Sequence, residues 1–207
     1  RIAVPAGSVV LYDGTVFQSL TMADGLDLAD ALFQATDLFG NYVDAQLLWA
    51  AESLNDLPSS SNENDTSVVL SLRWSDRRIL LMGDAEQHVE EELVRAAQSG
   101  EIDLTAHVLK VGHHGSSTSS TSDFLNATLG NADASTWAVI SSGRKSFGGE
   151  QLPTQQTIAA LKARLYDYRL LSTENRDEER SEGEEHGDDH IIVTIGPNGE
   201  VRACYVP

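Results

Sequence analysis

The sequence predicts an α/β protein in which a mixed β-sheet packs against helices. From residue 67 onward, short apolar runs typical of strands alternate with segments of helical spacing. That alternation favours parallel strands joined by helices. Two further strand patterns, at 191–195 and 201–205, flank a Pro-Asn-Gly turn and indicate a terminal antiparallel hairpin. The sheet is therefore expected to contain strands of both orientations.

The first 66 residues carry weaker patterns. Residues 8–12 resemble a strand, and apolar residues between 26 and 35 fall near helical spacing, which predicts a helix. A short apolar run at 46–50 predicts another strand. The polar stretch 51–66, with its Pro-Ser-Ser-Ser and Asn-Glu-Asn-Asp runs, predicts a loop.

The pattern is sharper from residue 67 to the end of the chain. Strands are expected at 67–74 and 78–82, as a hairpin, and then at 108–111, 137–141 and 168–171. Helices are expected at 87–98, with Gly100 as C-cap, at 123–129 and from Pro153-Thr154 onward. The segment 174–189 holds nine acidic residues among sixteen and is expected to be a solvated loop.

Composition limits the classes of function. We expect one domain over residues 1–207, since 41% hydrophobic residues suffice for a core. Cys204 is the single cysteine, which excludes an internal disulfide and a cysteine-based zinc site. No run approaches about 20 apolar residues, so no membrane-spanning helix is expected. A net charge of -18 repels nucleic acid from most of the surface, so a polyanionic substrate would require metal ions or a local basic patch.

Two motifs that directly follow predicted strands are candidates for chemistry. Gly83-Asp84-Ala85-Glu86 places the Asp84 carboxylate at a strand end, where it could ligate metal; a plain turn or a helix N-cap is the simpler interpretation. Glu86 is expected to be an acid of the first helical turn. In Gly112-His113-His114-Gly115, neighbouring histidines on an extended segment would point to opposite sides, so one of them could reach a metal. Structural packing is the alternative, but the two motifs together favour a metal site.

Polar residues beside the histidine pair could contact phosphate oxygens. Lys110 and the hydroxyls of Ser116, Ser117 and Thr118 are the candidates for substrate binding. A polar loop without a binding role is the alternative for the hydroxyls. Ser116 is disfavoured as a nucleophile, because no strand-turn-helix elbow surrounds it.

These motifs, in this order and spacing, resemble the metallo-β-lactamase superfamily, in particular the hydrolase domain of ComEC-type competence proteins and their stand-alone relatives. The resemblance covers residues 60–205 best, and its matching stretches are 64–70, 79–86, 108–119 and 137–143. It implies an αβ/βα sandwich, of which this chain resembles the C-terminal half. It also implies a site with two zinc ions, or manganese, in which Asp84 bridges the metals and either His113 or His114 is a ligand. The implied activity is hydrolysis of phosphodiesters or nucleic acid by a metal-bound hydroxide.

The sequence departs from the family pattern in one major respect. The family's His-x-His-x-Asp-His motif is absent, because no histidine precedes His88. Since the sequence starts at Arg1 without a methionine, we expect its own N-terminal half, or another chain, to supply that motif. The alternatives are a degenerate relative that works as a non-catalytic half-domain, scaffold or binding module, and a chain that binds one metal weakly in another way.

Overall fold

The computed structural model of the chain confirms the mixed α/β class. It describes residues 8–12, 17–21, 32–36, 42–51, 57, 62–74, 76–143, 146–147, 149–174 and 190–205, with side chains from residue 45 on except those of 146, 147 and 167.

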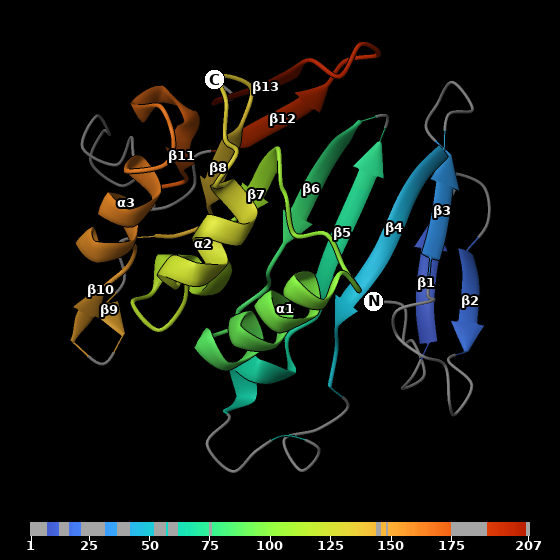
Figure 1. Ribbon diagram of the computed structural model, residues 1–207, viewed down its shortest axis with the longest axis horizontal. Coiled ribbons are helices and arrows are strands. Elements are labelled where there is room, and N and C mark those ends of the chain that lie inside the picture. The colour runs from blue at the N-terminus through green and yellow to red at the C-terminus, as the bar shows by residue number, and fades with distance from the viewer. Residues whose placement is uncertain are drawn as a thin grey trace, which may run out of the picture.

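A seven-stranded sheet forms the centre of the molecule, in the order β11-β8-β7-β6-β5-β4-β3 (Figure 1). Its strands are β3 (Leu32–Thr36), β4 (Tyr42–Trp49), β5 (Val69–Trp74), β6 (Arg77–Leu81), β7 (Val108–Lys110), β8 (Trp137–Ile140) and β11 (Leu170–Ser172). Neighbours from β3 to β6 are antiparallel, and neighbours from β6 to β11 are parallel. The orientation therefore changes at β6.

In the part of the chain that the structure describes, three further pairs of strands lie outside this sheet. They are β1 (Ser8–Tyr12) with β2 (Phe17–Thr21), β9 (Ser146–Phe147) with β10 (Glu150–Gln151), and β12 (Ile191–Ile195) with β13 (Val201–Tyr205). All three pairs are antiparallel, and the last is the predicted terminal hairpin.

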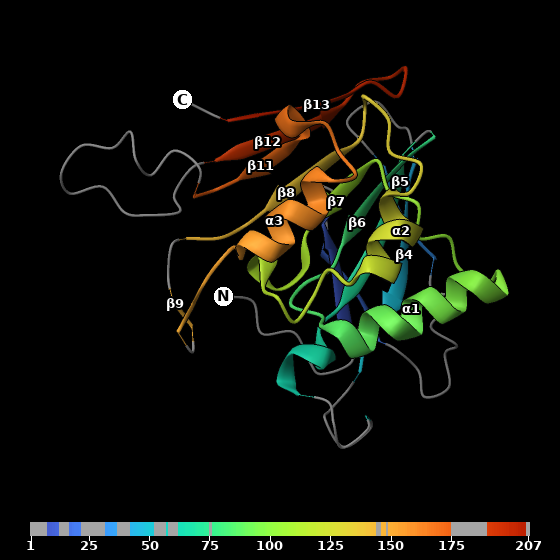
Figure 2. The same ribbon diagram turned by 60° about the vertical axis from the view of Figure 1, so that its left-hand side comes forward.

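Helices α1 (Gln87–Ser99), α2 (Ser122–Leu129) and α3 (Gln155–Lys162) cover one face of the sheet (Figures 1 and 2). Alternate strand residues such as Leu80, Leu109 and Ala138 point toward them, are fully buried and form the main core with side chains of the helices. Helix α1 ends as predicted, at Gly100 in a left-handed C-cap.

The hairpin β12–β13 packs on the opposite face of the sheet. Val108 and Trp137 form a second, smaller core there with Val201 of the hairpin. Trp137 Nε1 also donates to the Val201 carbonyl at 3.3 Å. The parallel half of the central sheet is therefore covered on both faces, which suits its near-continuous apolar strands.

One expected element near the N-terminus is wrong. Residues 32–36 form strand β3 and pair with β4, although the apolar spacing of 26–35 predicted a helix. Pairing with β4, the next strand along the chain, outweighed the local spacing here. In addition, the predicted strand at 168–171 is shifted, since Asp167–Arg169 is a 3-10 turn, η5, and β11 starts at Leu170.

Most of the acidic segment expected at 174–189 lies outside the described residues, from 175 on. Within the described ranges, no helix is long and apolar enough to cross a membrane.

Candidate metal centre

Asp84 and His114 face each other at the ends of two neighbouring parallel strands. Asp84 follows β6 in a turn, and His114 lies in a short 3-10 segment, η4 (Gly112–Gly115), directly after β7. Parallel strands bring their carboxyl ends to the same sheet edge, which is why these residues meet. His114 Nε2 lies 3.5 Å from Asp84 Oδ1, and both side chains are 43% exposed. The pair is therefore accessible to a ligand.

The ring orientation of His114 is fixed by the backbone of the next strand. Its Nδ1 lies 2.6 Å from the Ser141 carbonyl oxygen, just beyond β8. A carbonyl oxygen only accepts, so Nδ1 carries the proton. In a neutral imidazole, the lone pair then lies on Nε2, the nitrogen that faces Asp84. Histidines that ligate metals commonly donate their other ring N–H to a carbonyl or carboxylate in this way.

His113 has both ring nitrogens engaged by the protein. Its Nδ1 lies 3.0 Å from Glu86 Oε1 and 3.1 Å from Thr118 Oγ1. Its Nε2 lies 3.3 Å from Asn64 Nδ2, an amide group that donates. The lone pair on Nε2 is therefore occupied, and of the two histidines only His114 presents a free nitrogen toward Asp84.

The expectation that the two histidines lie on an extended segment is wrong. His113 and His114 both adopt left-handed backbone angles, with φ of 43° and 53°. This conformation is costly for residues with a Cβ and persists only where surrounding contacts enforce it. The His113 N–H donates to the Gly83 carbonyl, which ties this turn to the Asp84 turn. Histidine is enriched among left-handed residues, but that conformation is still too uncommon for two adjacent histidines to predict such a turn.

Glu86 is also placed differently from the expected first-turn acid. It is the N-cap residue of α1, but its side chain makes no capping hydrogen bond. Its carboxylate instead accepts from the amides of Asn62 and Asn64, at 2.8 Å each, and contacts His113. Sequence reasoning missed both asparagines, although their position just before a strand, in an Asn-x-Asn-Asp run, was a signal of local capping.

Lys110, a candidate phosphate contact, lies close to the same sheet edge. Its ammonium donates to the Val111 carbonyl at 2.8 Å. Burial lowers the pKa of Lys110 from its ordinary value, while the negative charge of Asp84 acts in the opposite direction. The ammonium is thus partly desolvated and electrostatically coupled to Asp84.

The serine-rich loop is fixed to helix α1. Glu90, which is 1% exposed, accepts from the backbone N–H groups of Ser120 and Thr121 at 2.6 and 2.7 Å. Burial raises the pKa of Glu90, although these two N–H groups partly offset the effect. The Gln87 N–H donates to the Thr118 carbonyl, a further tie between α1 and the loop.

The three candidate hydroxyls of this loop differ in exposure. Ser116 is buried and contacts Thr118, whereas Ser117 is exposed and donates to Glu150. Thr118 is exposed and contacts His113. A role for these three hydroxyls in substrate binding stays a prediction.

The donor set fits part of a metal site. Two ligands of one tetrahedral zinc ion, with bonds of about 2.0–2.1 Å, are separated by about 3.3 Å, close to the 3.5 Å between His114 Nε2 and Asp84 Oδ1. An imidazolium that donates to the carboxylate would satisfy the same contact. The described residues gather no third His, Cys, Asp or Glu here, and a catalytic zinc usually has three protein ligands.

Neither a protein-family model nor a curated protein matches this chain. The resemblance to the metallo-β-lactamase superfamily therefore depends on the motifs themselves, and it stays a prediction.

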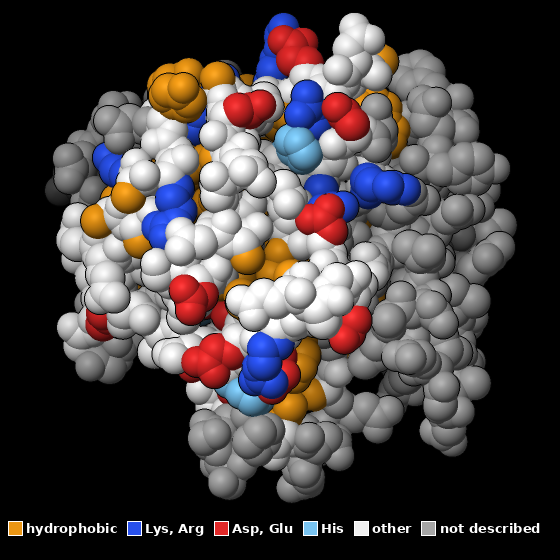
Figure 3. Space-filling model, in the orientation of Figure 1, with side chains coloured by type: hydrophobic (Ala, Val, Ile, Leu, Met, Phe, Trp, Pro, Cys, Tyr) orange, Lys and Arg blue, Asp and Glu red, His pale blue; other side chains and the backbone are white. Residues whose placement is uncertain are grey.

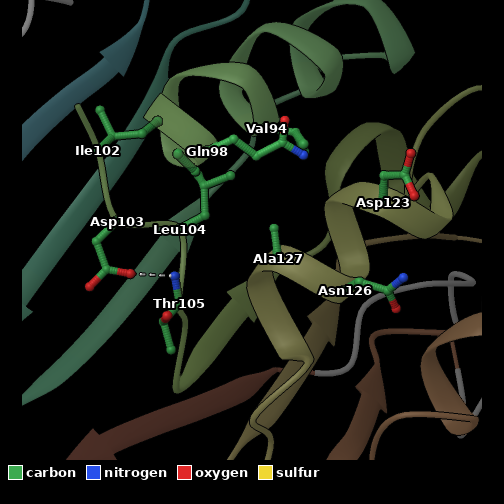
Figure 4. Close-up of a pocket in the computed structure, with 10 residues that line it drawn as sticks. Val94, Gln98, Ile102, Asp103, Leu104, Thr105, Asp123, Asn126 and Ala127 are labelled. Carbon is green, nitrogen blue, oxygen red and sulfur yellow. Dashed lines mark hydrogen bonds between the residues drawn. The ribbon is translucent and has the colours of Figure 1, made fainter. Parts of the chain in front are cut away.

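A surface groove of about 600 Å³ lies elsewhere, between α1, the segment 102–105 and α2 (Figure 4). Its lining mixes apolar side chains, such as Val94 and Leu104, with Asp103 and Asp123. Asp103 accepts from the Thr105 N–H at 2.9 Å (Figure 4). None of the residues predicted from the sequence to carry chemistry lines this groove.

Proposed function

We propose that this chain contributes Asp84 and His114 to the metal centre of a metallo-β-lactamase-fold hydrolase that acts on phosphodiesters or nucleic acid. One observation carries the proposal: Nε2 of His114 faces a carboxylate oxygen of Asp84 at 3.5 Å, with the other ring nitrogen held by the Ser141 carbonyl. Two acceptors that face each other repel unless a proton or a cation lies between them. Both donors are ligand types that zinc and manganese accept.

The chain's own residues would orient the ligands. Ser141 fixes the His114 ring, and the Ser67 hydroxyl accepts from the Asp84 N–H at 3.0 Å. His113 is then a positioning residue, because its contacts with Glu86 and Asn64 hold the turn that carries His114. A divalent metal, when bound, lowers the pKa of coordinated water and stabilises developing negative charge.

Lys110 supports a phosphate-containing substrate. A desolvated ammonium near the sheet edge attracts anions more strongly than an exposed one, since water screens it less. A local cation is also needed to offset the net charge of -18. The family resemblance points to the same substrate class.

The remaining ligands would come from outside the described residues. A segment with His-x-His-x-Asp-His, in another part of the same protein or in another chain, would complete the site. The second candidate is a non-catalytic scaffold that completes a partner's sheet. It is favoured because the described residues contain no group of three His, Cys, Asp or Glu that could hold a metal ion.

Zinc titration into the metal-free chain, followed by calorimetry, tests the proposal. We expect the wild type to bind zinc and Asp84→Asn and His114→Gln to lose that binding. His190→Gln, which changes an exposed histidine, is the matched control and should bind as the wild type does. Zinc binding that survives both Asp84→Asn and His114→Gln would contradict the site, and a wild type without zinc binding would favour the scaffold.

Activity is tested on the complete assembly. Asp84→Asn should abolish hydrolysis of bis-p-nitrophenyl phosphate, because it removes the anionic ligand while keeping the shape of the side chain. Unchanged turnover in this variant would exclude Asp84 from the reaction.

A further inference from the structure

Two exposed tyrosines lie side by side after helix α3. Tyr166 and Tyr168 are 55% and 60% exposed, among the few large hydrophobic side chains at the surface of the described part of the chain. Their ring centroids are 5.9 Å apart, with the planes tilted by 31°. Solvent-exposed rings in this arrangement offer a flat apolar face to a further ring.

An arginine extends this aromatic surface. The guanidinium of Arg169 lies 4.2 Å from the ring centroid of Trp137 and 4.9 Å from that of Tyr168. Its Nε is buried and finds no hydrogen-bond acceptor among the described residues. Its aromatic neighbours orient the positive charge but do not neutralise it.

More cations lie on the adjoining end of α3. Arg164 donates to Asn126, Ser122 and the Ala160 carbonyl, which are all uncharged. Lys162 is exposed in the last turn of the helix. Figure 3 shows blue side chains gathered over this part of the molecule, at the upper left, beside exposed orange ones. Lys162, Arg164 and Arg169 are three of the 14 lysine and arginine residues in a chain of net charge -18.

This surface is separate from the Asp84–His114 pair. Tyr166, Tyr168 and Arg169 precede β11, and Trp137 is the first residue of β8, so they lie at the amino ends of parallel strands. Asp84 and His114 follow the carboxyl ends of β6 and β7. The two sites are therefore at opposite ends of the parallel half of the sheet.

We propose that Tyr166, Tyr168 and Arg169, with Arg164 and Lys162 beside them, form a binding surface for single-stranded nucleic acid. Bases stack on exposed aromatic rings regardless of sequence, while arginine and lysine side chains contact the phosphates. A base pair buried within a duplex does not offer its face in this way, so the surface selects unpaired strands. This inference does not depend on the proposed hydrolase activity.

Fluorescence anisotropy with a labelled oligothymidylate of about 12 nucleotides tests the surface. The experiment uses the full chain in the presence of EDTA, so that bound metal plays no part. We expect the wild type to bind the oligonucleotide more tightly than a duplex of equal length. Tyr166→Ala/Tyr168→Ala should weaken binding about 5- to 150-fold for each base that stacks.

Matched variants separate stacking from loss of fold. Tyr166→Phe/Tyr168→Phe keeps the rings and should bind as the wild type does, whereas Lys162→Gln should reduce the salt dependence by about one phosphate contact. Arg95→Gln removes an exposed cation of α1 and is the control for net charge. Tyr166→Ala/Tyr168→Ala should bind zinc as the wild type does, so that failure of the metal site and failure of this surface are distinguishable.

Two results would overturn the proposal. One is a wild type that binds the oligonucleotide no better than Tyr166→Ala/Tyr168→Ala does. The other is an alanine variant with unchanged oligonucleotide binding but altered sedimentation, which would identify the tyrosines as a contact between protein chains.

Discussion

Glu86 Oε1 lies 3.0 Å from Nδ1 of His113, and the same carboxylate accepts hydrogen bonds from Asn62 and Asn64. These contacts join three segments that are distant in sequence: the residues before β5, the start of α1 and the turn after β7. The side chain of Glu86 is only 14% exposed, so water can replace few of these contacts. Glu86 is therefore central to the position of the histidine turn.

Glu86→Ala should loosen that turn without removing either proposed metal ligand. We expect the nitrogen-15 chemical shifts of the His113 ring to change, because Nδ1 loses its carboxylate partner. His114 should keep its protonated Nδ1, since Ser141 still accepts from it. Where zinc binds, its affinity should fall about 10- to 100-fold, as is usual when an outer partner of a ligand is lost. Glu91→Ala, an exposed acid of α1, is the control, and equal effects of both variants would contradict this role.

Glu90→Gln should lower the free energy of unfolding by about 1–3 kcal/mol. The carboxylate accepts from two backbone N–H groups, at Ser120 and Thr121, whereas an amide has one acceptor oxygen and leaves one buried donor unpaired. Urea denaturation at pH 7 measures the change. Glu91→Gln, its exposed neighbour, should change the free energy far less, and a similar loss there would show that helix charge matters more than the two hydrogen bonds.

His107 should make the stability depend on pH. Its Nδ1 accepts from the Arg78 N–H at 3.1 Å, which requires a neutral ring. Burial, and then the charge of Arg77, lower the pKa of His107. The folded protein thus holds this proton less tightly than the unfolded chain, whose pKa is about 6.5. The contribution to stability is present above about pH 6.5 and is lost as the pH falls from there through the folded value.

His107→Asn keeps an acceptor near the position of Nδ1 but does not titrate. Its unfolding midpoint should therefore fall less than that of the wild type between pH 7.5 and 5.5, measured in urea. His190→Asn changes an exposed histidine and should follow the wild type. Parallel curves for wild type and His107→Asn would contradict the assignment.

Alanine substitutions at two glycines distinguish the stability cost of backbone strain from that of steric clash. Gly100 and Gly115 both have left-handed φ, +83° and +78°. A Cβ at Gly100 would meet nothing within 4 Å, whereas one at Gly115 would lie 2.7 Å from the Pro153 Cβ. Gly100→Ala should cost about 1–2 kcal/mol of stability from the backbone alone. Gly115→Ala should cost about 1–3 kcal/mol more, from overpacking. Equal losses in thermal unfolding would show that Pro153 moves aside.

The sequence predicted most regular elements from residue 67 on, because local spacing and capping agree there with the final packing. Helix α1 illustrates this agreement, with apolar positions such as Val89 and Leu93 in the core and Gly100 at its end. Strand β3 was missed, because its apolar residues also fit a helix and only pairing with β4 decides between the two.

The placement of the candidate site residues was predicted in part, and their function stays a prediction. Asp84 and the histidine pair follow strand ends, a position that sequence alone can assign. The roles of the two histidines could not be assigned, since they depend on contacts with Glu86, Asn64 and Ser141 from other segments. Left-handed backbone at His113 could not be predicted either, because this conformation is uncommon for any residue with a Cβ, although histidine is enriched in it.

The change of strand orientation at β6 has a consequence for the order of folding. The antiparallel strands β5 and β6 form a tight hairpin, in which Leu72 pairs with the nearby Ile79. In the parallel half, Leu80 of β6 pairs with Leu109 of β7, and the chain between these two residues includes the whole of helix α1. Closing the shorter loop costs less entropy, so the antiparallel half is expected to assemble first and to offer β6 as a template for the parallel half. Asp84, which follows β6, is then expected to reach its final position early. His114 is expected to approach Asp84 only after β7 has paired with β6. We therefore expect the Asp84–His114 contact to form late in folding, so that its presence would report that both halves of the sheet have come together.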